Sequence, residues 1–136
     1  MSWLTLLKGS PINSRLQGAI DDFRVYRRVL PASEIRTLAC ESAYSSICDG
    51  LVANWQFDGD LKDTSLSRWH GTAIGATDAT LFVPSFAGGG VALRLDGMDD
   101  YVALPARILG GPMTACVHAR FDGFTCEDPR WLCCEF

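Results

Sequence analysis

The sequence contains no apolar run long enough to cross a membrane as a helix, so we expect no membrane span. It has no excess of basic residues, because twelve Lys and Arg against sixteen Asp and Glu give a net charge of −4. A protein that binds the nucleic-acid backbone needs a basic face, so we expect no nucleic-acid partner. The first residues, MSWLTLLKGSP, lack the basic start, the apolar length and the cleavage site of a secretory signal.

The sequence also lacks a recognisable set of catalytic residues. Its two histidines, His70 and His118, have no nucleophile motif near them. Cys116 and His118 would share one face of a strand, but cysteine in a strand is more often a small core residue than a nucleophile. We therefore expect no enzymatic activity.

What the sequence does contain is typical of an all-β protein. Hydrophobic residues make up 48% and charged residues 21%, a globular composition with enough apolar side chains for a core. Thirteen glycines and six prolines separate short apolar runs, which favours a sandwich or a barrel. One short helix is expected near residues 31–40, because Pro31 suits a first turn and Ile35, Leu38 and Ala39 recur at helical spacing.

Alternating apolar residues predict several strands. In the strand at residues 18–27, Asp21 and Phe23 share one face, and Asp22 lies on the opposite face. In the strand at residues 51–57, Trp55 and Phe57 alternate with polar residues, so we expect both in the core. Further strands are expected at residues 91–95 and 102–104, around a turn at residues 97–100, and at residues 113–124.

Six cysteines point to an oxidising compartment and leave several disulfide pairings open. They are Cys40, Cys48, Cys116, Cys126, Cys133 and Cys134. The first two bracket a connecting segment, which a disulfide between them would close. The last two are adjacent and cannot easily bond to each other, so at least one needs another partner. A zinc site made of Cys116, His118 and that adjacent pair would not have the well-separated ligand pairs of structural zinc sites.

Five stretches of the chain form a recognisable set. They are GAIDDFRVYRRVLPASEI, GLVANWQFDGDLKDTS, HGTAIGA, GGGVALRLDGMDDYVALP and MTACVHARFDGF. Together they resemble the laminin G-like group of the concanavalin A-like lectin/glucanase superfamily. The resemblance covers most of the chain and implies a partial concanavalin A-like jelly-roll sandwich, within the all-β class.

The order of these stretches differs from the order in the family. The closing strand and helix come first, and the central strands have no counterpart after Phe121. We therefore expect the end of one laminin G-like module at residues 1–40, a linker at 41–49, and the N-terminal part of the next module at 50–136. The alternative is a permuted domain. Since the first and last strands of the family are neighbours in one sheet, we predict antiparallel pairing of residues 18–26 with residues 51–57.

The sequence lacks the catalytic acids of the glucanases in this superfamily. Glucanases of the superfamily carry alternating acids on one strand, and no such run is present here. Retaining glycoside hydrolysis needs two carboxylates about 5 Å apart, whereas Pro129 interrupts the acids Glu127, Asp128 and Glu135. A glycoside hydrolase relative without its acids is therefore the least favoured alternative.

Family members often carry calcium, which binds carboxylate, carbonyl and water oxygens. The calcium candidates are Asp21, Asp22 and Asp58, since pairing of the first and last strands would bring them near one another. Asp22 can reach solvent, calcium or an arginine (Arg24 or Arg27), whereas Asp21, if buried, needs backbone donors or a metal. Further candidates are Asp60, Asp96, Asp99 and Asp100. The alternative for the last three is capping of backbone amides in a turn.

A lectin site stacks a sugar on an aromatic ring and fixes its hydroxyls with polar groups. The ligand-binding candidates are Trp69, Tyr101, Asp99 and Asp100. Trp69 lies in a polar loop and Tyr101 follows an acidic turn, so we expect both rings to be exposed. The alternative for Trp69 is a loop anchor.

We therefore expect a non-catalytic binding module for a carbohydrate or protein ligand, assisted by calcium. The family resemblance and the cysteine content imply an extracellular or cell-surface location. The alternative is a purely structural or interaction fragment of a larger surface protein. An incomplete sandwich has open sheet edges and an exposed inner face, so we also expect self-association through those edges.

Overall fold

The computed structural model describes residues 3–6, 16–40, 48–75, 81–86, 89–105 and 111–123. In chain order the elements are β1 (Trp3–Leu6), β2 (Gln17–Tyr26), α1 (Ala32–Cys40), β3 (Leu51–Trp55), β4 (Thr72–Ile74), β5 (Phe82–Pro84), β6 (Val91–Asp96), β7 (Tyr101–Pro105) and β8 (Thr114–Gly123). Every strand pairing between them is antiparallel. The predicted all-β class with one short helix is confirmed. Within the described residues, no helix has the length and apolar character that a membrane crossing requires.

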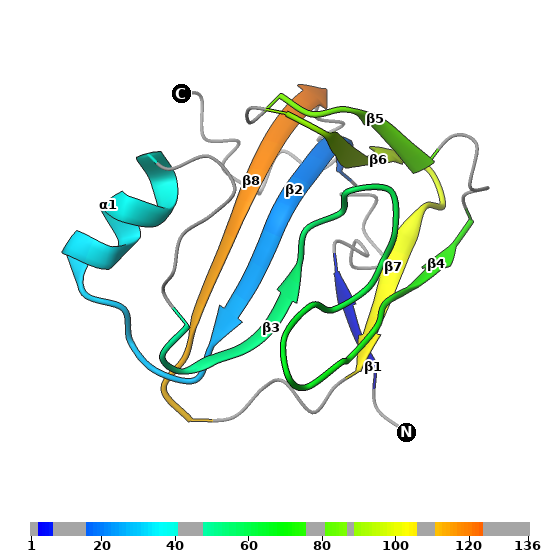
Figure 1. Cartoon of the computed structure of the whole chain (residues 1–136). Helices are drawn as coiled ribbons and strands as arrows, with labels where there is room; N and C mark the ends of the chain where they lie inside the picture. Colours follow the sequence, from blue (N-terminus) through cyan, green and yellow to red (C-terminus); the bar gives the residue numbers. More distant parts are fainter. Residues whose placement is uncertain are drawn as a thin grey trace, which may run out of the picture.

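β2 is the central strand of the larger sheet (Figure 1). Along one side it pairs with β3 through residues 23–26 and with β6 through residues 17–20. Along its other side it pairs with β8, and β5 extends the sheet beyond β6. The smaller sheet has the order β1-β7-β4. β2 therefore pairs with three of the strands that follow it in the chain.

The predicted pairing of residues 18–26 with residues 51–57 is confirmed. Phe23 lies opposite Trp55 and Val25 opposite Ala53. β3 ends at Trp55, two residues earlier than expected, because Phe57 adopts a positive φ of 58° that an extended strand does not allow. The pairing meets the requirement of the permuted arrangement. The division of the chain into residues 1–40, 41–49 and 50–136 stays a prediction.

The main core lies between the two sheets. Trp55 and Phe57 are buried, as predicted, at 0% and 1% exposure. The rings of Phe23 and Trp55 stack with their centroids 5.5 Å apart. Val102 and Leu104 of β7 join the same cluster from the smaller sheet. Aromatic side chains therefore contribute much of the apolar area that the sandwich buries.

The helix α1 packs through a second, smaller cluster. Leu38 contacts Tyr26 and Leu30 there, as its helical spacing predicts. Ile35, expected on the same packed stripe, is 45% exposed. The expectation that Ile35 packs down beside Leu38 is therefore wrong, because Ile35 lines the open cavity next to the helix instead.

The cysteines are described only in part. Cys48 and Cys116 carry free thiols. Because Cys48 is free, the expectation that a Cys40–Cys48 disulfide closes the connecting segment is wrong. The side chains of the other four cysteines lie outside the described residues, so any pairing among them stays a prediction.

Candidate functional site

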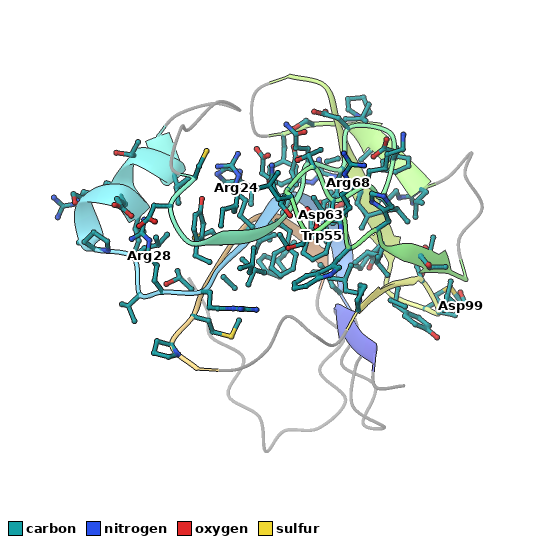
Figure 2. All side chains as sticks on the ribbon, turned by 60° about the horizontal axis from the view of Figure 1, so that its bottom comes forward. Arg24, Arg28, Trp55, Asp63, Arg68 and Asp99 are labelled. Carbon is teal, nitrogen blue, oxygen red and sulfur yellow. The ribbon has the colours of Figure 1, made fainter. Side chains whose placement is uncertain are left out.

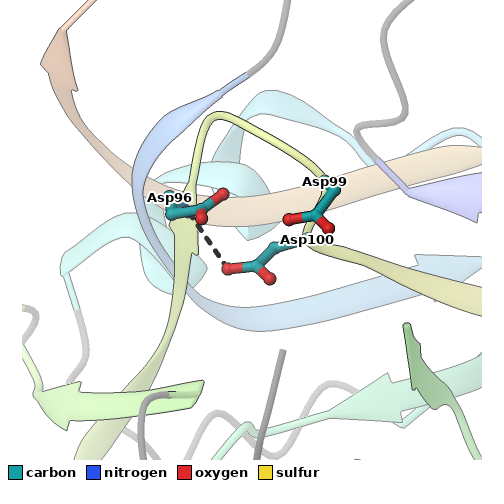
Figure 3. A group of neighbouring side chains, drawn as sticks. All are labelled: Asp96, Asp99 and Asp100. Carbon is teal, nitrogen blue, oxygen red and sulfur yellow. Dashed lines mark hydrogen bonds between the residues drawn. The ribbon is translucent and has the colours of Figure 1, made fainter. Parts of the chain in front are cut away.

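Three carboxylates come together at the turn between β6 and β7 (Figure 3). Asp96, Asp99 and Asp100 each offer an oxygen, and these oxygens all lie within 4.8 Å of one another. Gly97 makes the turn possible with a φ of 78°, and the backbone N–H of Met98 donates to Asp96 Oδ1 at 2.7 Å. We refer to Asp96, Asp99 and Asp100 as the turn acids.

The turn acids repel one another. Burial raises the pKa of Asp100, and the charge of Asp96 raises it further. The Asp96 backbone N–H donates to Asp100 Oδ2 at 3.3 Å, which offsets only part of this repulsion. None of the ion pairs within the described part of the chain includes a turn acid. A bound cation would therefore relieve an unfavourable arrangement.

The four predicted ligand-binding residues fall in two places. Tyr101 lies at the start of β7 beside the turn acids, opposite Ile74 of β4. It is half-buried, so the expectation of a fully exposed ring is wrong for Tyr101. Trp69 precedes β4, at the other end of that pairing. Its ring is half-buried against the main core, so the expectation of an exposed ring is wrong for this residue. The Trp69 carbonyl accepts a hydrogen bond from Trp55 Nε1 at 3.0 Å, as a loop anchor would.

Asp63 holds the loop around Trp69 in place, although it was not among the functional residues predicted from the sequence. Its carboxylate is 3% exposed and accepts hydrogen bonds from four donors. They are the backbone N–H groups of Asn54 (2.9 Å), Ser65 (2.8 Å) and Trp69 (2.8 Å) and the Ser65 hydroxyl (3.0 Å). Figure 2 shows Asp63 beside Trp55, with which it forms an isolated bridge. The polar run DLKDTS after a buried strand was the only available signal.

The acids Asp21 and Asp22 lie at a bulge in β2. The register with β8 shifts between Asp21 and Arg24, and Asp22 takes a positive φ of 51°. The extra residue turns Asp21 away from the Phe23 face, so the predicted face of Asp21 is wrong. Asp22 Oδ1 accepts from the Arg24 guanidinium at 3.2 Å, the ion pair considered above.

Asp21 finds its donors within the protein. Its carboxylate accepts from the backbone N–H of Asp22 at 2.9 Å and from the Ser85 hydroxyl at 2.5 Å. Burial raises the pKa of Asp21, and the charges of Asp22 and Asp58 add to this effect. The strand pairing thus brings Asp58 into electrostatic range of Asp21. Within the described residues, however, the turn acids are the only group of three whose oxygens lie within 4.8 Å.

A cavity of about 330 Å³ lies between α1 and the bulge. Asp22, Arg24, Leu38, Cys116 and His118 are among its lining residues. His118 Nδ1 is buried without a hydrogen-bond partner and lies 3.8 Å from Asp22 Oδ2. Burial raises the pKa of the Cys116 thiol, which is the opposite of the shift that activates a cysteine nucleophile.

The buried carboxyl of Asp21 predicts a specific pH dependence of stability. Its pKa in the folded chain is raised above 3.8, so its ionised form opposes folding. This cost disappears as the pH falls through the raised pKa towards 3.8. Chemical denaturation between neutral and acidic pH should therefore show the parent gaining stability relative to Asp21→Asn.

A matched variant tests the sign of this effect. The hydrogen bond from Lys62 lowers the pKa of Asp60, so Asp60 stabilises the fold above its unfolded pKa and loses that contribution in acid. Against Asp60→Asn, the parent should lose relative stability as the pH falls. If the stability difference between parent and variant changed with pH in the same direction for Asp21→Asn and Asp60→Asn, the raised pKa of Asp21 would be contradicted.

Comparisons with protein-family models, with curated proteins and with solved structures find no match to this chain. The interpretation of the site therefore rests on its own geometry.

Proposed function

We propose that the chain is a non-catalytic binding module with a concanavalin A-like jelly-roll sandwich. It binds a carbohydrate or a protein ligand outside the cell or at its surface, and calcium assists that binding. The fold contributes two antiparallel sheets around one core, which agrees with a sandwich. The observation that carries the proposal is the cluster of turn acids.

The spacing of the turn acids suits one calcium ion. Calcium–oxygen distances are about 2.3–2.6 Å, so two ligands of one ion are at most about 5 Å apart. The oxygens of Asp96, Asp99 and Asp100 lie within 4.8 Å of one another, and the residues are partly or fully exposed. Three carboxylates with one oxygen each fill at most half of the usual six to eight coordination positions, so oxygens of water and of a ligand complete the set.

The surroundings of the turn acids suit a polar ligand. Asp99 is exposed, and Tyr101 presents a half-buried ring close to it in sequence. A sugar that shares the calcium ion through its hydroxyls would be held beside this ring. Trp69 lies beyond the far end of β4, so we assign it no part in this site.

The candidates Asp21, Asp22 and Asp58 are less suited to calcium. Asp21 and Asp22 already accept hydrogen bonds from Ser85 and Arg24. Calcium would have to compete with the Arg24 guanidinium for Asp22. We therefore propose that calcium binds at the turn acids. Calcium binding at Asp21, Asp22 and Asp58 instead is an alternative that the experiments distinguish.

A glycan array with and without calcium tests the proposal. We expect calcium-dependent binding that Asp99→Asn weakens by about tenfold or more, because one of three anionic ligands is lost. Asp60→Asn is the matched control, since Asp60 is an exposed loop acid that pairs with Lys62 at 2.8 Å. No binding in either arm would favour the structural-fragment alternative. If Asp99→Asn and Asp60→Asn bound the glycan equally well, the calcium ion would not be bound by the turn acids.

A further inference from the structure

The cavity between α1 and the bulge in β2 is separate from the turn acids. Asp96 of the turn acids lies opposite Gln17 at the start of β2, whereas the cavity is lined by Asp22 and Arg24, further along that strand. Its volume of about 330 Å³ is at the lower end of the range of about 300–1,000 Å³ that is usual for small-molecule sites. The cavity therefore has room for a small ligand.

One wall of the cavity is aliphatic. It is formed by Ile35 and Leu38 of α1 and by Cys116 of β8, which packs against the small cluster around Leu38. Burial raises the pKa of the Cys116 thiol, so at neutral pH the thiol is uncharged and acts as a small apolar side chain. Among the described residues that line the cavity there is no aromatic ring. This wall therefore suits an aliphatic chain and not the face of a sugar.

The aliphatic wall is incompletely covered. Leu38 is 5% exposed, but Ile35 beside the cavity is 45% exposed. An aliphatic chain in the cavity would remove apolar surface of Ile35 from water, which favours binding.

The other wall carries a buried positive charge with hydrogen-bond donors to spare. The Arg24 side chain is 8% exposed. A guanidinium has five N–H donors. Within the described residues, Arg24 donates from Nε to Asn54 Oδ1 at 3.3 Å and from Nη2 to Asp22 Oδ1 at 3.2 Å. The exposed pair of Arg120 and Asp122, by contrast, has hydrogen bonds of 2.8 and 2.9 Å. Arg24 can therefore hold a second carboxylate through its remaining N–H groups.

His118 adds a further polar group to this wall. Its Nδ1 atom is buried without a hydrogen-bond partner in the described part of the chain. Asp22 Oδ2 lies 3.8 Å away, which is too far for a hydrogen bond. A buried polar atom without a partner is unfavourable. A ligand oxygen beside the ring would give an Nδ1–H group its acceptor, so His118 and Arg24 favour the same kind of head group.

We propose that this cavity binds a small aliphatic carboxylate. The carboxylate lies against the Arg24 guanidinium and beside His118, and the aliphatic chain lies along Ile35 and Leu38. The site needs no calcium and shares no residue with the turn acids. It therefore adds a second kind of ligand to the proposed function and does not depend on the first.

Isothermal titration calorimetry in calcium-free buffer with EDTA tests the chemistry of the ligand. Hexanoate should bind saturably, and about tenfold or more tightly than hexanamide, hexanol or hexylamine, which have the same chain without the negative charge. From acetate to hexanoate, each added CH₂ group should tighten binding about two- to fourfold. No saturable binding of hexanoate, or binding of an uncharged or cationic analogue as tight as that of hexanoate, would overturn the proposal.

Two substitutions of exposed residues test the position of the ligand. Ile35→Glu places a negative charge beside the expected chain and should raise the dissociation constant of hexanoate about tenfold or more. Leu66→Glu is the matched control, since Leu66 is a fully exposed apolar residue that does not line the cavity, and the change in net charge is the same. Equal effects of the two substitutions would overturn the proposal.

Arg24→Lys tests the head-group contact. It keeps the positive charge but loses the planar fork, so the preference for hexanoate over hexanamide should fall about tenfold. An unchanged preference in a folded variant would overturn the assignment of the carboxylate to Arg24. Circular dichroism and the Tm of each variant establish that it is folded, and the two substitutions by Glu keep the test valid if Arg24→Lys does not fold.

Discussion

Gly18→Ala is expected to lower the free energy of unfolding by about 3 kcal/mol, because it overpacks the junction between β2 and β8. A Cβ atom on Gly18 would overlap the carbonyl oxygen of Arg120. That oxygen belongs to the backbone and cannot rotate away as a side chain would. The two strands would have to separate locally, which breaks hydrogen bonds of the longest pairing in the sheet. Urea denaturation monitored by tryptophan fluorescence measures the change.

Gly89→Ala is the matched control for this variant. A Cβ atom on Gly89 would meet no heavy atom within 4 Å, and its φ lies outside the left-handed region. Alanine there should be neutral or should stabilise the chain by up to about 1 kcal/mol, through a less flexible unfolded state. Equal effects of the two substitutions would contradict the close approach of β2 and β8.

Asp63→Ala is the second substitution with a large expected effect, a loss of about 4 kcal/mol. Three backbone N–H groups, those of Asn54, Ser65 and Trp69, would lose their acceptor. A buried donor without an acceptor bears the full cost of desolvation. The loop that positions the Trp69 carbonyl for Trp55 would lose its anchor as well. Near-ultraviolet circular dichroism of the tryptophans should therefore change together with stability.

Asp60→Ala is the corresponding control. Asp60 is an exposed acid in the same loop, with Lys62 as its partner. An exposed pair of this kind contributes below about 1 kcal/mol. If Asp63→Ala cost no more than Asp60→Ala, the four hydrogen bonds to the Asp63 carboxylate would not be the anchor of the loop.

The pairing of β2 with β3 was predictable because both strands keep a period of two where they meet. Phe23 and Val25 alternate against Trp55 and Ala53, so the sequence pattern alone places these residues on the core face. Periodicity does not say which strands are neighbours, and the expectation that these two strands pair came from the family resemblance; the other pairings of β2, with β6 and β8, were not predicted. The helix was also predictable from its apolar periodicity, here of about 3.6 residues, and Leu38 packs on the face that this spacing indicates.

The bulge in β2 was not predictable from that pattern. Ile20 and Phe23 both lie in the main core although they are three residues apart, because one extra residue at Asp21–Asp22 resets the alternation. A strict period of two therefore assigned Asp21 to the wrong face. The position of a bulge depends on the partner strand, here β8, and not on the residues of β2 alone.

The turn acids were predictable as candidates because they are close in sequence, so a tight turn necessarily gathers them. The role of Asp63 was not predictable, because its four donors come from three separate residues that only the folded loop brings together. The interpretation of Trp69 as an exposed ring failed for the same reason. Long-range hydrogen bonds determine which polar-loop residue is an anchor and which is exposed.

A calcium titration followed by ¹H–¹⁵N correlation spectra tests most directly whether the turn acids hold the ion. We predict saturable shifts centred on the amides of Asp96 to Tyr101, with a dissociation constant of about 0.1–1 mM, as is common in extracellular modules. Asp99→Asn should raise this dissociation constant by about tenfold or more, whereas Asp60→Asn should leave it unchanged. Shifts centred on Asp21, Asp22 and Asp58, or no saturable shift at millimolar calcium, would contradict a calcium site at the turn.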